Sequence, residues 1–214
     1  VAAVFIEPVA GSTGTLVPPK GYLERIRKIC DQHGILMIFD EVITGFGRMG
    51  TPFGAHKFGV TADICTMAKA LTNGAIPMGA VAVKDEIYDT VTNASPENAI
   101  EFFHGYTYSA HPAACAAGIA TQKIYEDEGL FQRAADMESY FLDAIWSLKD
   151  HPLVKDLRGI GMMAGVEVHH DGVPGRRGQQ MQKDMFWNGL HIKFTGDNGI
   201  VAPAFVAERN HIDE

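Results

Sequence analysis

Three short apolar runs constrain the fold more than any other feature of this chain. They cover Val1–Ile6, Ile35–Phe39 and Asp63–Ala68. A segment with helical spacing of apolar residues, Pro18–His33, separates the first two runs, and proline suits the first turn of a helix. Continuous apolar runs predict parallel strands covered on both faces, joined by a right-handed crossover. The predicted fold class is therefore α/β.

The connection from the third run to Ala80–Val83 is too short for a parallel crossover. The sheet should therefore be mostly parallel, with this one antiparallel strand. Helices are expected at Pro112–Glu128 and Leu130–Leu148. The remaining predictions are a bent strand, a helix and two short strands, at Val154–His169, Gln179–Trp187, Leu190–Phe194 and Gly199–Ala202.

These patterns predict two structural units. Residues 1–135 should form part of a large α/β domain that includes an interdomain helix, and residues 136–214 a small α+β domain that is incomplete at its end. Val1 begins inside a strand pattern, and Asn210–Glu214 reads as a helix cap followed by an interrupted first turn. We expect this sequence to be part of a longer chain.

Composition excludes several classes of function. The formal net charge is -8 and no basic stripe is present, which argues against nucleic-acid binding. No apolar stretch reaches the roughly 18 residues that a membrane span needs. Cys30, Cys65 and Cys115 lie far apart and share no metal-ligand spacing, so neither zinc nor another metal is predicted. Isolated thiols favour a reducing compartment, which we take to be the cytoplasm.

An amine and a carboxylate follow two of the predicted strands. Lys69 ends the run from Asp63, and Asp40 ends the run from Ile35. The carboxyl ends of strands in an open α/β sheet form the edge where ligands bind. A lysine and an aspartate so placed suit a pyridoxal phosphate site, with lysine as the imine-forming group and aspartate as partner of the pyridine nitrogen.

Two other segments have both a functional and a simpler structural interpretation. Gly45–Gly50 fits the dinucleotide pattern G-x-G-x-x-G, but Thr51-Pro52 follows and no helix opens there, so a ligand-shaping loop is favoured. The segment His104–Pro112 gathers hydroxyl groups and histidines ahead of a helix. It suits either phosphate binding or N-terminal capping, and the residues alone leave both open.

Together these motifs resemble the class III aminotransferases, which are fold-type I pyridoxal phosphate enzymes, and within them the ω-amino acid:pyruvate branch that includes β-alanine–pyruvate aminotransferases. The motifs that carry the resemblance are Glu7-Pro8-Val9-Ala10-Gly11, Phe39-Asp40-Glu41-Val42-Ile43-Thr44-Gly45-Phe46-Gly47-Arg48, Met67-Ala68-Lys69-Ala70-Leu71, His104-Gly105-Tyr106-Thr107-Tyr108-Ser109-Ala110-His111-Pro112 and Arg158-Gly159-Ile160-Gly161. Their order and spacing match over nearly the whole chain.

The resemblance implies a role for each matching residue. Lys69 would carry pyridoxal 5'-phosphate and move the substrate proton, while Asp40 would pair with the ring nitrogen. Val42 would pack on the ring, and Thr107 would bind the phosphate held by a neighbouring subunit. The active form would then be a homodimer or a higher homo-oligomer. Glu7 would lie near the substrate and pair with a basic residue there.

The same resemblance places Lys193 where relatives commonly carry an arginine for the substrate carboxylate. Lysine lacks the planar fork of arginine, so carboxylate binding here should differ. The implied reaction moves an amino group from an ω-amino acid or amine to an α-keto acid such as pyruvate. Two alternatives stay open: another class III reaction, by an aminomutase or a decarboxylating transaminase, or a non-catalytic α/β binding or oligomerisation domain.

Overall fold

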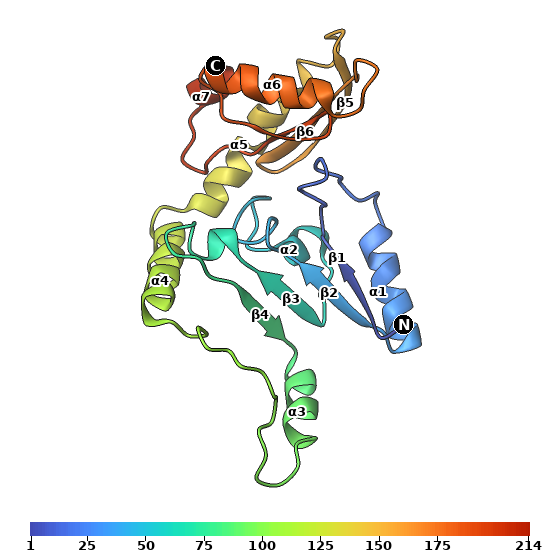
Figure 1. Cartoon of the computed structure of the whole chain (residues 1–214), viewed down its shortest axis with the longest axis vertical. Coiled ribbons are helices and arrows are strands. Elements are labelled where there is room, and N and C mark those ends of the chain that lie inside the picture. The colour runs from blue at the N-terminus through green and yellow to red at the C-terminus, as the bar shows by residue number, and fades with distance from the viewer.

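A computed structural model describes all residues, 1–214, and contains two four-stranded sheets (Figure 1). The first sheet has the order β1-β2-β3-β4, formed by Ala3–Ile6, Leu36–Asp40, Ile64–Met67 and Ala80–Val83. Strands β1, β2 and β3 are parallel, and β4 is antiparallel to β3. The mostly parallel α/β sheet with one antiparallel strand is therefore confirmed.

The helix between β1 and β2 begins later than the prolines suggested. Helix α1 covers Tyr22–His33, and Gly21 before it has a left-handed backbone with φ of 84°. A residue that precedes proline is pushed out of the helical region, so Pro18 cannot start a helix ahead of Pro19. Instead, the Tyr22 N–H closes a turn by donating to the Pro19 carbonyl at 3.0 Å. The predicted start at Pro18 is wrong by four residues.

Only one face of the first sheet is covered. Met37 and Phe39 of β2 are buried against Leu23 and Cys30 of α1. The opposite face carries Phe5, whose exposed fraction is 60%, together with Ile38, Ile64 and Val83 in one cross-strand row. The expectation that the first strand is covered on both faces is therefore wrong for these 214 residues.

The second sheet is antiparallel, with the order β5-β6-β8-β7. Its strands are β5 Val154–Ile160, β6 Met163–Val168, β7 Lys193–Thr195 and β8 Asn198–Val201. The single bent strand predicted over residues 154–169 is wrong, because the chain reverses at Gly161-Met162 and forms a hairpin. Gly161 has φ of +57°, which L-residues other than glycine adopt rarely.

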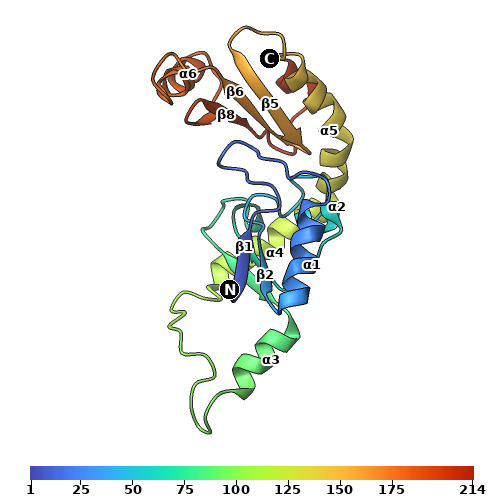
Figure 2. The same ribbon diagram turned by 90° about the vertical axis from the view of Figure 1, so that its right-hand side faces the viewer.

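Helices connect and flank the two sheets (Figures 1 and 2). Helix α5 carries the chain from the first sheet to the second, where its residues Ala134, Phe141 and Ile145 pack with Met162 and Ala164. Helix α6 lies on the other side of the second sheet in Figure 2. The remaining bounds are α2 Gly54–Phe58, η1 Lys69–Leu71, α3 Asp85–Asn93, α4 Pro112–Asp127, α5 Leu130–Trp146, α6 Arg176–Trp187 and α7 Arg209–Asp213.

The division into domains at residues 1–135 and 136–214 stays a prediction. Residue 136 lies inside α5, so the boundary falls within a continuous helix rather than a linker. None of the helices combines the length and the apolar character that a membrane crossing requires.

Candidate active site

Lys69 follows the carboxyl end of β3, and Figure 1 shows that this end of the strand faces the second sheet. It is the first residue of the short 3₁₀ helix η1, two residues after β3 ends at Met67. Its φ of 47° places it in the left-handed region, which costs a residue with a Cβ roughly 1–2 kcal/mol. Strained backbone of this kind clusters at functional sites, so the lysine is held in place by its surroundings.

Helix α4 supplies that support. The hydroxyl of Tyr125 donates to the Ala70 carbonyl at 2.8 Å, and the amide of Gln122 donates to the Leu71 carbonyl at 3.3 Å. After η1, the hydroxyl of Thr72 donates to the Ile76 carbonyl at 2.6 Å. The turn that carries Lys69 is therefore fixed from behind by two side chains of one helix.

Asp40 ends β2 beside the strand that leads to Lys69. It pairs with Thr66 in the parallel register, and Lys69 follows three residues later. Neighbouring strands lie about 5 Å apart and each residue advances about 3.3 Å, so the two Cα atoms are within about 12 Å. Asp40 and Lys69 thus share one sheet edge, as the sequence predicts.

Asp40 keeps hydrogen-bonding capacity. Its Oδ1 accepts the Val42 N–H at 3.0 Å, whereas Oδ2 has no protein partner. The hydroxyl of Thr66, its register neighbour, is buried and also has no partner. Buried polar groups are almost always hydrogen-bonded. Asp40 Oδ2 and the Thr66 hydroxyl are therefore both available to hydrogen-bond a polar ligand at this edge.

A cavity of about 530 Å³ opens beside Lys69. It brings together Lys69 and Val42 from the first sheet region and Lys193 from β7 of the second. The other lining residues are Gly11, Ser12, Ile43, Gly45, Arg48, Ala70, Asn73, Gly74, Met163, Ile200, Ala202 and Phe205. Three cations and no carboxylate line the cavity, which favours an anionic ligand.

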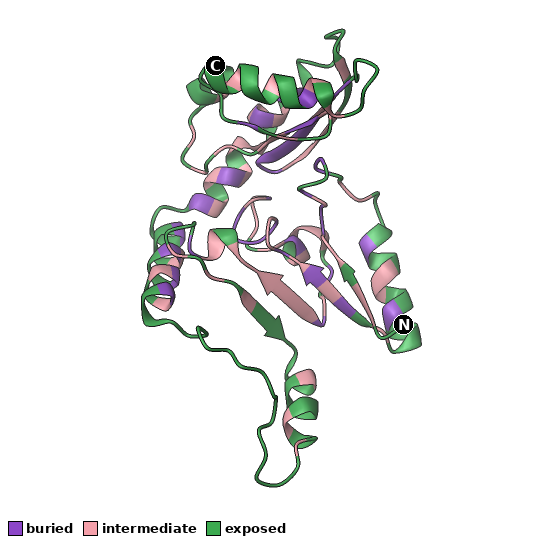
Figure 3. Ribbon diagram, viewed as in Figure 1, coloured by how far each residue is buried: buried purple, intermediate pink, exposed green.

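Three predicted site residues do not line this cavity. Asp40 lies next to it, two residues before Val42. Glu7 lies in the loop after β1, where its Oε2 accepts the Gly11 N–H at 3.0 Å, and it makes no ion pair. Thr107 is exposed in a turn of the segment between α3 and α4. Figure 3 shows that this segment and α3 project from the molecule and are exposed along almost their whole length.

Glu41 has a structural role that its place in the sequence did not reveal. Its buried carboxylate accepts the Thr44 hydroxyl at 2.6 Å and the backbone N–H groups of Gly54 and Ala55 at 2.7 and 2.8 Å. It therefore fixes the glycine-rich turn after β2 to the start of α2. As predicted, no helix opens at Gly50, so the G-x-G-x-x-G pattern has no dinucleotide-binding geometry.

Cys65 can be set aside as a nucleophile. Burial, helped by the carboxylates of Glu41 and Asp40, raises the pKa of its thiol to about 12. A thiol with that pKa stays protonated at neutral pH, and only the thiolate is reactive.

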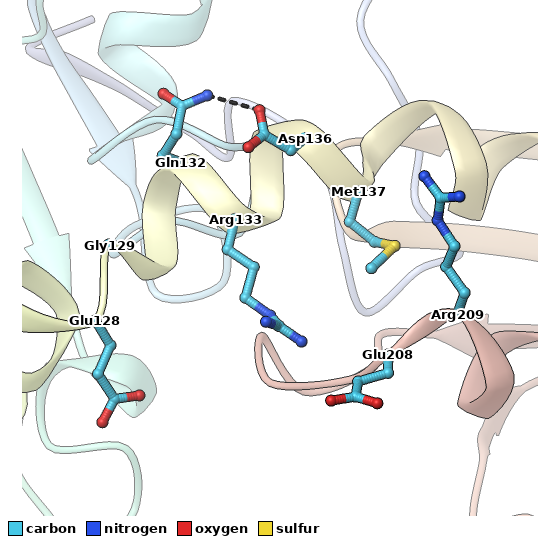
Figure 4. Close-up of a pocket in the computed structure, with 8 residues that line it drawn as sticks. All are labelled: Glu128, Gly129, Gln132, Arg133, Asp136, Met137, Glu208 and Arg209. Atoms are coloured by element: carbon cyan, nitrogen blue, oxygen red, sulfur yellow. Dashed lines mark hydrogen bonds between the residues drawn. The ribbon is translucent and has the colours of Figure 1, made fainter.

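A larger hollow of about 630 Å³ lies elsewhere, between α5 and the segment that leads into α7 (Figure 4). In this hollow Arg133 donates to the carbonyls of Phe205, Val206 and Ala207. Its lining is open, charged and almost devoid of apolar residues, unlike typical small-molecule sites. The smaller cavity at Lys69 is therefore the better candidate for chemistry.

Comparison with known proteins identifies the family of this chain. The sequence pattern described as "Aminotransferase class-III" matches residues 1–214. The chain belongs to the class III aminotransferases. The resemblance read from the motifs is thereby confirmed.

Named members of the class are close in sequence and in structure. The chain is 54% identical over 214 residues to the omega-aminotransferase of Caulobacter vibrioides and 48% identical over 215 residues to the beta-alanine–pyruvate aminotransferase of Pseudomonas aeruginosa. Both alignments cover all of this chain and 48% of the relative. An (S)-enantioselective omega-transaminase from Thermomicrobium roseum superimposes with a TM-score of 0.93 at 39% identity, over 100% of this chain and 48% of that structure.

This class III chain thus spans about half the length of its relatives. Its residues nevertheless fit the class cofactor, pyridoxal 5'-phosphate. Lys69 offers an amine in a cavity, Asp40 offers a free carboxylate oxygen, and Thr66 beside it offers a hydroxyl without a partner. The cationic lining also suits a group that carries a phosphate.

Proposed function

We propose that the full-length polypeptide containing this chain is a pyridoxal phosphate-dependent aminotransferase. It moves an amino group from an ω-amino acid or amine to an α-keto acid such as pyruvate. The observation that carries the proposal is the position of Lys69. Its backbone is strained, and its side chain lines a cavity whose charged lining residues are all cationic. Membership in class III and relatives named for this reaction support it.

Each proposed role combines the resemblance to class III with the place of the residue in the fold. Lys69 Nζ would hold the cofactor covalently and would move the proton at the reacting carbon, because its amine lines the cavity and shares a sheet edge with Asp40. Asp40 Oδ2 would accept a hydrogen bond from the protonated ring nitrogen, and Val42 would pack on the ring. When bound, pyridoxal phosphate supplies the electron sink for the carbanion that forms on the substrate.

Lys193 is the proposed anchor for the substrate carboxylate. It is exposed on β7 and lines the same cavity as Lys69. Replacing it in Lys193→Met should raise the KM for pyruvate about tenfold, because a charge-assisted hydrogen bond is lost. Steady-state kinetics at saturating amine measure this change, and an unaltered KM would remove Lys193 from the site. Glu7 stays a proposed substrate-side residue, and its carboxylate also accepts the Gly11 N–H.

We also propose a homodimer or higher homo-oligomer in the cytoplasm. Thr107 supports the oligomer, because it is exposed in a projecting segment with Phe102, Phe103 and Tyr108, all largely exposed. Such a segment suits a partner subunit, where Thr107 would bind the phosphate of the neighbouring site. The separate free cysteines support the compartment.

The decisive test is chemical trapping. Borohydride reduces a carbon–nitrogen double bond to a stable single bond, so reduction of the full-length holoenzyme followed by peptide mapping should find a pyridoxyl group on Lys69. The Lys69→Ala variant should carry none and lose activity by about a thousandfold or more. Lys57→Ala, which removes a lysine outside the cavity, serves as the control. An unmodified Lys69 peptide in the wild type would favour a non-catalytic binding domain instead.

A further inference from the structure

Arg48 joins the two sheets at the edge of the Lys69 cavity. It lies in the glycine-rich turn after β2, yet its Nη1 donates to the carbonyls of Met162 at 2.9 Å and Pro203 at 2.7 Å. Its own carbonyl accepts the Met162 N–H at 2.9 Å. Both partners belong to the region of the second sheet, so one side chain spans the junction between the two halves of the site.

The guanidinium also stacks on an aromatic ring. Its central carbon lies 4.6 Å from the centroid of Phe205, and both residues line the Lys69 cavity. Burial lowers the pKa of Arg48 to about 10, which still leaves the side chain charged at neutral pH. No carboxylate forms an ion pair with it. A buried cation is costly without compensation, and carbonyl oxygens and a ring face provide it here.

These contacts reach Lys193 through the second sheet. Pro203 and Phe205 lie two and four residues after the end of β8, and the β8 residue Ile200 pairs with Lys193 of β7. Ile200, Ala202 and Phe205 form the cavity wall on this side. The position of this wall relative to Lys69 is set where the two sheets meet, and Arg48 provides the hydrogen bonds at that point.

We propose that Arg48 is a positioning residue for keto-acid recognition. It holds the wall that carries Lys193 at the correct distance from Lys69, and it adds a second fixed positive charge facing the substrate carboxylate. This inference rests on the proposed aminotransferase function. It explains how a site with lysine in place of the usual arginine keeps enough positive charge and rigidity to bind a carboxylate.

Arg133 offers a matched control. It also donates to main-chain carbonyls of this segment, those of Phe205, Val206 and Ala207, but it lines the separate hollow shown in Figure 4. Arg133→Gln therefore loosens the same segment without removing a side chain that lines the Lys69 cavity. A change in KM that both variants show reflects loosening of this segment. A change that only Arg48→Gln shows reflects the place of Arg48 in the cavity.

The experiment compares both variants in the full-length holoenzyme. Arg48→Gln should raise the KM for pyruvate about tenfold or more, with kcat changed less than about threefold. The KM for 1-phenylethylamine, an amine without a carboxylate, should change less than about threefold, and cofactor absorbance should be retained. Arg133→Gln should leave both KM values within about twofold.

Arg48→Lys guards against a variant that fails to fold. It keeps the charge but loses the planar stack on Phe205, so its KM for pyruvate should rise about threefold. An unchanged pyruvate KM in the folded Arg48 variants, or equal changes in Arg48→Gln and Arg133→Gln, overturns the positioning role alone. A wild type without pyruvate-dependent turnover overturns the proposed function together with it.

Discussion

Asp63 is a buried carboxylate with three hydrogen-bond donors around it. Its carboxylate accepts from Arg27 of α1 at 2.8 Å, from Lys84 after β4 at 2.6 Å and from the Met37 N–H of β2 at 2.7 Å. Burial alone would raise its pKa, but these three hydrogen bonds prevail and lower it from 3.8 to about 2. One carboxylate thus joins three elements at the sheet edge opposite Lys69.

This shift predicts a pH dependence of stability. The carboxyl group binds its proton more weakly in the folded state, so its contribution of about 2 kcal/mol is complete above pH 4 and disappears as pH falls toward 2. Wild type and Asp63→Asn should therefore differ by about that amount at pH 7 and converge near pH 2. Urea unfolding at a series of pH values measures the difference.

Asp31 provides the comparison for that measurement. It also pairs with Arg27, at 2.7 Å, but it is exposed. Asp31→Asn should cost less than about 1 kcal/mol at any pH, as surface pairs do. Equal losses for the two variants would show that burial of Asp63 contributes nothing.

The sequence alone was sufficient to place a candidate residue when the signal lies in its immediate sequence neighbours. Lys69 and Asp40 could be recognised because each ends an apolar run, and strand ends converge at one edge. Arg48 and Glu41 were missed, although both stand in the motif that includes Asp40. The partners of Arg48 lie 114 and 155 residues away, and no periodicity in the sequence signals contacts of that range.

At the scale of single elements, the β5–β6 hairpin depends on its glycine turn. A Cβ at Gly161 would lie 2.5 Å from the Met49 Cα and 2.6 Å from the Arg48 carbonyl oxygen, both main-chain atoms. Its N–H donates to Glu138 at 2.7 Å, which adds a further constraint. The hairpin therefore fits against the first sheet's glycine-rich turn only when this position has no side chain.

We expect Gly161→Ala to destabilise the protein by about 3 kcal/mol or more, through backbone strain and steric overlap. Gly129→Ala is the matched control, since Gly129 has φ of 59° and open space where a Cβ would go. It should cost only about 1 kcal/mol, from strain alone. Thermal unfolding of both variants measures the two effects, and similar values would show that the close approach relaxes freely.

Helices and strands were predicted correctly where the length of a connection or the spacing of apolar residues determines the geometry. The antiparallel direction of β4 followed from a connection too short for a crossover, and the helices at α4 and α5 followed from spacing. The hairpin was missed because Gly159-Ile160-Gly161 reads equally as a bend or a turn. Only packing against Met49, more than 100 residues earlier, requires the full reversal.

At the scale of the whole molecule, the proposed role of Thr107 predicts complementation between subunits. Co-expression of Lys69→Ala with Thr107→Ala subunits gives mixed dimers in which one site has both intact residues. Activity should then reach about a quarter of the wild-type value, because half of randomly paired dimers are mixed and each has one whole site. Differently tagged subunits, purified in tandem, measure the mixed dimers directly.

If Thr107 serves the site of its own subunit, neither site of the mixed dimer is whole. The mixed dimers would then be no more active than Thr107→Ala alone. Thr107→Val in place of the alanine variant keeps the side-chain volume and isolates the hydroxyl. A gain over both parents therefore distinguishes the shared site from the local one.

The hydrogen bond from Tyr125 to the carbonyl of Ala70 has a consequence for how this site can be damaged or tuned. The turn that carries Lys69, the proposed reactive amine, is held by helix α4, and no residue of that helix lines the cavity. A substitution in that helix can therefore shift Lys69 while every residue that lines the cavity is unchanged. Comparing only the cavity-lining residues of two variants would not detect such a change.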